Sequence, residues 1–145
     1  MKVYLDVSCL NRPFDDQRQA RVRIEAEAVL MILALVESGE WSHVSSTMAV
    51  KEINAGSDWE RRDRMLEMLP EDSGIMEVSD AVLQRGEELE RVGLHAADAI
   101  HVAAAEAQQA DAFVTCDDRL LRVARRRARM FRVRVCDPIT LMREQ

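Results

Sequence analysis

The sequence predicts an α/β domain in which helices cover both faces of a parallel sheet. Short apolar segments rich in β-branched residues alternate with longer segments whose apolar residues recur at helical spacing. The first apolar segment, which begins at Lys2, ends in the carboxylate of Asp6, and the carboxyl ends of strands are where open α/β sheets bind ligands. The length suits one domain, residues 1–145, with a single core.

The first half of the chain contains two strands and three helices. Residues 2–6 form a buried strand, and the polar segment 11–16, with its proline, forms a loop. Apolar residues at helical spacing predict a helix over 17–38, which Gly39 ends. Residues 41–45 form the second strand.

Capping signals define the next two helices. Ser46 or Thr47 begins a short helix that ends at Gly56. The spacing Ser57-x-x-Glu60 is a capping box that begins the following helix, which ends before the next proline.

The second half repeats the alternation. We expect strands over 74–78, 112–115 and 131–135, the last with alternating apolar and arginine residues that are typical of an edge strand. The intervening helices run from Ser79 to Val92, from Leu94 to Ala105, and from Asp117 or Asp118 to Arg129.

The composition indicates a folded chain, with 48% hydrophobic and 32% charged residues. No apolar run approaches the roughly 20 residues that span a bilayer, and no signal-peptide pattern is present, so we expect a cytoplasmic protein without a membrane partner. Three cysteines without C-x-x-C spacing argue against a disulfide framework or a zinc knuckle.

The net charge of −6 conceals a basic segment. Eight arginines and no acid lie between Arg119 and Arg134. Such a run is either a solvated helix face or a surface that contacts phosphates without reading sequence. Arg119, which follows the acids of the 117–118 pair, is a candidate to bind the substrate.

Four acids are candidates for a functional site. Asp6 ends the first strand and Asp117 follows the strand at 112–115, so both acids meet at one crevice if these strands are neighbours. Asp98 lies in the first turn of the alanine-rich helix, and Glu52 lies on the short helix after the second strand. Carboxylates gathered in this way raise one another's pKa, and a divalent cation held by oxygen ligands removes that penalty.

Each acid also has a structural explanation. Asp98 and Asp117 could simply face a helix dipole, and Glu52 could be a surface residue. Asp6 is harder to explain in this way, because a carboxylate next to a buried strand needs a partner. Asp118 caps the last predicted helix while Asp117 serves the site, or the two roles are exchanged.

Three further side chains are candidates for supporting roles. His101 lies three residues after Asp98 and shares a helix face with it, so it either orients a neighbour or contacts a phosphate. Ser8 and Thr115 either hydrogen-bond to a ligand carboxylate or a metal-bound water, or simply form turns.

With these residues placed, the sequence resembles the PIN-domain nuclease family, and especially the toxin ribonucleases of bacterial VapBC-type toxin–antitoxin pairs. Four segments in a fixed order carry the resemblance, which spans essentially the whole chain: Tyr4–Cys9, Val50–Ile53, Ala97–Ala103 and Val114–Leu121.

The resemblance implies a Rossmann-like three-layer α/β/α sandwich with a parallel sheet of about five strands. It implies Mg²⁺ or Mn²⁺ at Asp6, Asp98 and Asp117, with Glu52 completing the acidic cluster. It further implies an RNA substrate, water as the nucleophile, a homodimer and a small antitoxin protein as partner.

We therefore expect a Mg²⁺- or Mn²⁺-dependent endoribonuclease. One alternative is a non-catalytic RNA- or protein-binding domain on the same fold. A haloacid-dehalogenase-like phosphohydrolase fits less well, because that chemistry needs a D-x-D motif and a later lysine, whereas the chain has Asp6-Val7-Ser8 and only the lysines Lys2 and Lys51. The glycine-rich phosphate-binding motifs G-x-x-x-x-G-K and G-x-G-x-x-G are both absent.

Overall fold

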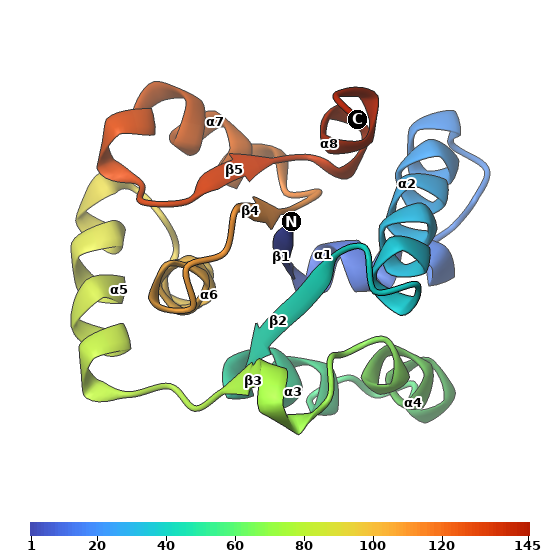
Figure 1. The fold of residues 1–145 in the computed structure, drawn as a ribbon, viewed down its shortest axis with the longest axis horizontal. Helices are drawn as coiled ribbons and strands as arrows, with labels where there is room; N and C mark the ends of the chain where they lie inside the picture. Colours follow the sequence, from blue (N-terminus) through green and yellow to red (C-terminus); the bar gives the residue numbers. More distant parts are fainter.

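A computed structural model describes all residues from Met1 to Gln145. Its five strands form one parallel sheet in the order β3-β2-β1-β4-β5 (Figure 1). The strands are β1 (Lys2–Leu5), β2 (Ser42–Ser46), β3 (Ile75–Met76), β4 (Ala112–Val114) and β5 (Arg134–Cys136). This arrangement confirms the predicted three-layer fold, with β1 in the middle of the sheet and with β3 and β5 at its edges.

Eight helices surround the sheet, and α5 and α6 lie on the opposite side from α2 and α8 (Figure 1). The helices are α1 (Val7–Asn11), α2 (Ala20–Glu37), α3 (Thr47–Asn54), α4 (Trp59–Glu67), α5 (Asp80–Val92), α6 (Ala96–Ala107), α7 (Asp118–Arg126) and α8 (Pro138–Arg143). Short 3₁₀ turns occur at Arg12–Phe14, Asp72–Gly74 and Ala128–Met130.

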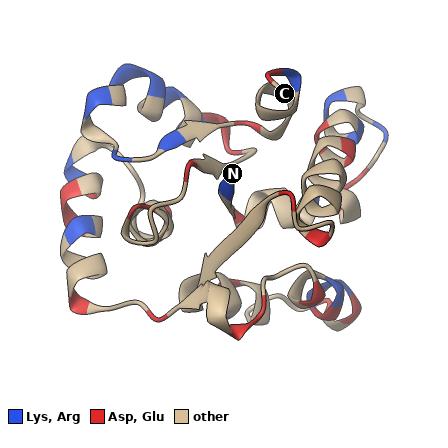
Figure 2. Cartoon of the chain, in the orientation of Figure 1, with Lys and Arg blue, Asp and Glu red and all other residues tan.

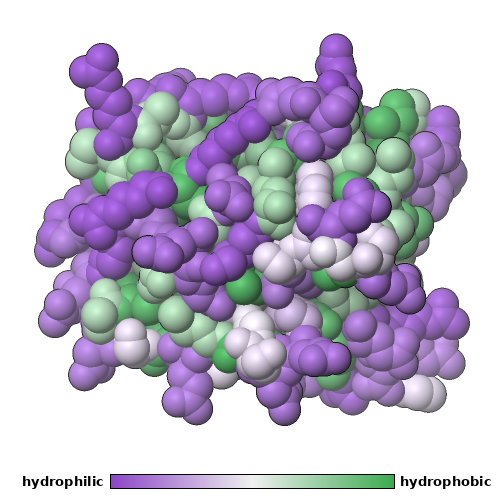
Figure 3. All heavy atoms as spheres, viewed as in Figure 1, coloured by the Kyte–Doolittle hydropathy of each residue, from purple (hydrophilic) through white to green (hydrophobic).

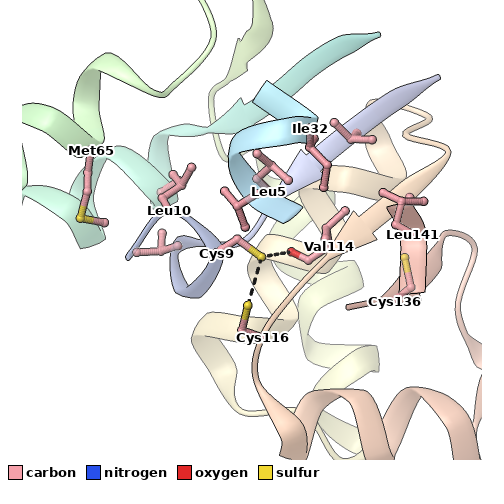
Figure 4. Packing of buried hydrophobic residues seen from close by; sticks show 14 of the residues in the cluster. Leu5, Cys9, Leu10, Ile32, Met65, Val114, Cys116, Cys136 and Leu141 are labelled. Atoms are coloured by element: carbon pink, nitrogen blue, oxygen red, sulfur yellow. Dashed lines mark hydrogen bonds between the residues drawn. The ribbon is translucent and has the colours of Figure 1, made fainter. Parts of the chain in front are cut away.

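The sheet divides the apolar core into two clusters, where the length alone had suggested one. Side chains alternate along a strand, so Val3 and Leu5 of β1 face one side of the sheet and Tyr4 faces the other. The first cluster contains Cys9, whose Sγ points toward Cys116 Sγ and the Val114 carbonyl (Figure 4). Both faces of the sheet are therefore buried, as the continuous apolar strands require.

Small side chains bring α6 close to its neighbours. Ala99, Ala103 and Ala104 are buried in the second cluster. A Cβ atom added at Gly86 of α5 would lie only 3.5 Å from Cγ1 of Ile100, so the two helices are in close contact at this glycine. This packing determines where α6 presents Asp98 and His101.

Two short helices were not predicted. Helix α1 begins directly after β1, with Asp6 as its N-cap, in a segment too short to show helical periodicity. Helix α8 begins with Asp137 and Pro138, a cap followed by proline at the first position, which is a start signal that pattern reading could have used.

The predicted boundaries near the C-terminus also need correction. Helix α7 ends at Arg126 instead of Arg129, and a 3₁₀ turn occupies Ala128–Met130. The last strand is β5 at Arg134–Cys136 instead of residues 131–135. The alternating pattern there reflects Phe131 and Val133, which pack into the second cluster before the strand begins.

Polar and charged groups cover much of the molecular surface in the view of Figure 3, with apolar atoms in scattered patches. None of the helices combines the length and the apolar character needed to cross a membrane.

The predicted capping box at Ser57 and Glu60 is wrong. The N-cap of α4 is Asp58, whose Oδ1 accepts a hydrogen bond from the Arg61 N–H at 3.2 Å. The Ser57 side chain makes no such contact, because it lies one position too early for the first turn.

We predict that Asp58→Ala lowers the free energy of unfolding by about 1 kcal/mol, the usual value of an N-cap. Ser57→Ala, the matched control, is expected to leave it unchanged. Urea unfolding monitored by circular dichroism measures both. A larger loss of unfolding free energy for Ser57→Ala than for Asp58→Ala would support the capping box predicted at Ser57 and Glu60.

Candidate active site

The site lies at the carboxyl edge of the sheet, between β1 and β4. These strands pair in parallel with Leu5 opposite Val114, and the Asp6 N–H donates to the Val114 carbonyl at 2.9 Å. Asp6 and Asp117 therefore follow two neighbouring strands at the point where the strand order reverses, as predicted, and such switch points form ligand-binding crevices.

Asp6 is buried, with 5% of its surface exposed. Its Oδ1 accepts the Val7 N–H at 2.9 Å, and its Oδ2 accepts the hydroxyls of Ser8 at 2.8 Å and Thr115 at 2.7 Å. Burial raises the pKa of Asp6, while the charge of His101 and the two hydroxyls oppose that rise. The two hydroxyl residues chosen from the sequence thus both hold one oxygen of this carboxylate.

Asp98 lies in the first turn of α6 and is partly buried. Burial raises its pKa to about 6, and the negative charges of Asp6 and Asp117 add to the rise. The charges of Asp6 and Asp117 therefore both act on the Asp98 carboxylate.

Asp117 caps α7. Its Oδ1 accepts the N–H groups of Arg119 at 2.9 Å and Leu120 at 3.2 Å. Asp118 is exposed and forms an ion pair with Arg21 of α2, with Nη1 3.0 Å from Oδ2. The two adjacent acids thus face different partners, and Asp117 is the one whose charge reaches Asp98.

Glu52 belongs to a hydrogen-bonded chain that runs into the core. Its Oε2 is 2.7 Å from His101 Nε2, while His101 Nδ1 is 2.7 Å from the Tyr4 hydroxyl, which is 2.7 Å from Ser46 Oγ. The Glu52 side chain is 44% exposed and that of His101 only 1%. Through His101, an otherwise exposed carboxylate is attached to the central strand.

The charge state of His101 orders this chain of hydrogen bonds. Burial alone would lower the pKa of His101, but the hydrogen bond to Glu52 and the charge of Asp6 hold it above its ordinary value. Burial raises the pKa of Tyr4, so its hydroxyl stays protonated. When both ring nitrogens of His101 are protonated, which this shift favours, the imidazolium donates to Glu52 and to the Tyr4 oxygen, and Tyr4 then donates to Ser46.

Tyr4 and Ser46 were not among the candidate residues predicted from the sequence. Tyr4 was interpreted only as part of an apolar strand, and Ser46 only as a helix cap. Ser46 does cap α3, accepting the Ala49 N–H at 3.4 Å, and it accepts the Tyr4 hydroxyl as well. The signal that could have found Tyr4 is a lone hydroxyl in a fully buried strand, which requires a partner.

A pocket of about 310 Å³ lies beside Glu52, between α1, α3 and α4. Val7, Ile53 and Met65 provide its apolar lining, while Glu52 and Arg62 contribute charged groups. Of the four predicted acids, only Glu52 lines this pocket.

The model of the PIN domain family matches residues 3–126. This chain belongs to the PIN-domain family. PIN domains are generally nucleases, and these nucleases depend on divalent metal ions. No curated protein matches the chain.

Among solved structures, the PIN domain described here is similar to a chain in the crystal structure of VapBC2 from Rickettsia felis bound to a DNA fragment from their promoter. The TM-score is 0.59 at 15% sequence identity, and the match covers 93% of this chain and 97% of that chain. At this identity the similarity establishes the fold.

The acids of this PIN domain suit a hard divalent cation. They provide only oxygen ligands, and burial together with the charges of Asp6 and Asp117 raises the pKa of Asp98. No three histidine, cysteine, aspartate or glutamate side chains lie close enough together to enclose an ion. Mg²⁺ tolerates this arrangement, because it keeps several waters and is usually held by one or two carboxylates.

The raised pKa of Asp98 predicts how stability depends on pH. At a pH between the ordinary pKa of 3.8 and about 6, Asp98 keeps a proton in the folded chain that it has lost in the unfolded chain. The stability of the fold is therefore greatest with respect to this group below pH 4, and it is reduced once the pH rises above 6. In EDTA at pH 7, Asp98→Asn should raise the free energy of unfolding by about 1–2 kcal/mol, less than the full shift implies because solvent screens the partly exposed carboxylate.

Urea unfolding at pH 4 and at pH 7 measures this effect. The gain should disappear at pH 4, where Asp98 is protonated in the folded state. Asp72→Asn, which alters an exposed acid outside the site, is the control and should show no gain at either pH. An Asp98 variant that is less stable than the parent protein at pH 7 would contradict the repulsion.

Proposed function

We propose that this PIN domain is a metal-dependent endoribonuclease that hydrolyses RNA phosphodiester bonds with water as the nucleophile. The observation that carries the proposal is that Asp6 and Asp117 follow the neighbouring strands β1 and β4 at the carboxyl edge of the sheet. Burial, together with the charges of these two acids, raises the pKa of Asp98 on α6. Acids that repel one another in a crevice are disfavoured unless a ligand neutralises them.

In this proposal Mg²⁺ or Mn²⁺ would bind among Asp6, Asp98 and Asp117, with one or two of these carboxylates as direct ligands and the remainder acting through metal-bound water. When bound, such an ion lowers the pKa of a water and polarises a phosphate oxygen. The protein's contribution is rigidity, because Asp6 is held by one N–H and two hydroxyls and Asp117 by the first turn of α7. Side chains fixed in this way pay little entropy when the substrate arrives.

Glu52 completes the acidic cluster in a different way. His101 engages its Oε2, which leaves Oε1 of this partly exposed side chain available to the substrate or to water. His101 is therefore a positioning residue, since it is buried behind Glu52 and bonded through both ring nitrogens. Of the other predicted supporting residues, Ser8 and Thr115 orient Asp6, Arg119 contacts the RNA, and Asp118 is held by Arg21.

We further propose that the protein is the toxin of a toxin–antitoxin pair. The fold match to 97% of a chain in a VapBC2 structure supports this, as does the ordered set of acids. A small antitoxin covering the acidic crevice would be the partner, with a homodimer as the assembly and the cytoplasm as the location. The alternative of a non-catalytic binding domain on the same fold is resolved by the experiment below.

The decisive experiment is cleavage of a mixed cellular RNA pool by the purified, partner-free protein in Mg²⁺, in Mn²⁺ and in EDTA. We expect cleavage only with metal, and a loss of at least about 100-fold for Asp98→Asn, equivalent to about 2.7 kcal/mol of transition-state stabilisation. Asp72→Asn should retain activity. A folded protein that cleaves no RNA in any lane would reject the nuclease in favour of the binding domain.

A paired substitution tests which of the two adjacent acids serves the site. Asp117→Asn should lower cleavage by about 100-fold or more, since its charge acts directly on the Asp98 carboxylate. Asp118→Asn should lower it by less than about tenfold, because Asp118 faces Arg21. Initial rates at saturating metal compare the two variants, and the reverse order would assign the role to Asp118.

A further inference from the structure

One face of α7 carries a row of exposed arginines. Arg119, Arg122, Arg125 and Arg126 recur at helical spacing and are all exposed, whereas the opposite face of the helix is buried. We call these four residues the arginine stripe. Figure 2 shows the basic residues gathered along α7 and the turn that follows it.

No carboxylate neutralises the arginine stripe. None of its members takes part in an ion pair, in contrast to Arg12 and Arg85, each of which contacts two carboxylates. The one acid on the same face, Asp118, is engaged by Arg21 of α2. In a chain with a net charge of −6, this concentration of unpaired positive charge is local and needs an explanation beyond solubility.

The arginine stripe begins at the candidate active site. Helix α7 starts immediately after its N-cap Asp117, and its nine residues extend about 13 Å from there at 1.5 Å per residue. Three further arginines continue the unpaired charge past the helix end: Arg127, Arg129 and Arg132. A polyanion lying along this face would have one end at the acids.

The chemistry of the arginine stripe favours a phosphate backbone over a protein partner. Protein interfaces have an apolar core depleted of charge, whereas the exposed face of α7 consists of charged side chains alone. Guanidinium groups bind phosphate oxygens in bidentate fashion, and several along a track bind nucleic acid without reading its sequence.

We propose that the arginine stripe binds the phosphates of the RNA strand on one side of the bond that is cleaved. The inference rests on the proposed function and adds to it the direction in which the substrate leaves the acidic crevice. Bound phosphates along α7 hold the strand against the helix, so the stripe contributes to RNA affinity and not to the chemical step.

Binding of a fluorescently labelled single-stranded oligouridylate in EDTA tests the proposal, with anisotropy measured over a series of salt concentrations. The stripe variant carries Arg122→Gln, Arg125→Gln and Arg126→Gln. The matched control carries Arg64→Gln, Arg91→Gln and Arg143→Gln, which remove the same charge from exposed arginines outside α7 that also lack ion pairs. Thermal melts by circular dichroism verify that both remain folded.

We expect the stripe variant to bind at least about tenfold more weakly than the control variant. The slope of log affinity against log salt should decrease by about 2, since each single-strand phosphate contact contributes about 0.7. Equal affinities for the two variants would overturn the proposal, as would tighter stripe-dependent binding of an acidic polypeptide such as polyglutamate.

Binding in EDTA separates this inference from the nuclease proposal. If the parent protein binds RNA through the stripe but cleaves none with either metal, the nuclease proposal fails and the stripe stands. If it cleaves RNA and the stripe variant binds like the control, the stripe fails and the nuclease stands. With both correct, the stripe variant raises KM for cleavage and leaves kcat close to that of the control.

Discussion

The direct pairing of β1 with β4 is the constraint on which the rest of the site depends. These strands are separated by more than a hundred residues in the sequence, and their register places Leu5 beside Val114. One result is that Thr115 reaches the carboxylate of Asp6, as Ser8 does from the other side. A shift of one residue would exchange Phe113 of β4 with Ala112 and Val114 between the two core clusters, so the packing of the core itself enforces the geometry of the site.

Charge balance is the second requirement of this geometry. Asp6 and Asp98 repel each other, and burial disfavours the charged form of both. Two neutral hydroxyls and the His101 imidazolium offset part of that cost, and His101 in turn is held by Glu52 and Tyr4. The compensation within the chain is incomplete, because the pKa of Asp98 remains high.

Local patterns were sufficient to predict the sheet, and they identified the four acids as candidates. The ends of the strands before Asp6 and Asp117 can be recognised in the sequence, because each is a short apolar run followed by a carboxylate. The chain from Glu52 through His101 to Tyr4 joins α3, α6 and β1, and no spacing in the sequence reveals such a contact. Helix α1 was missed because five residues are too few to show periodicity.

The ambiguity between Asp117 and Asp118 has the same origin. Both acids suit a helix N-terminus, so sequence spacing cannot distinguish them. The distinction comes from Arg21 on α2, which approaches Asp118 from an element almost a hundred residues earlier. Only after the layers have packed does one acid acquire a salt-bridge partner and the other a carboxylate neighbour.

Helix α7 connects the acidic candidate site with the arginine stripe. Its first turn fixes Asp117 in the acidic crevice, and its exposed face carries the arginine stripe away from it. These roles are compatible because they use different groups. Asp117 accepts backbone N–H groups of the first turn, whereas the stripe consists of arginine side chains. A cation and a phosphate backbone are complementary ligands for such a surface, since the first neutralises the crevice and the second the helix. The net charge of −6 therefore says little about which ligands this surface can bind, because the positions of the charged groups matter more than their sum.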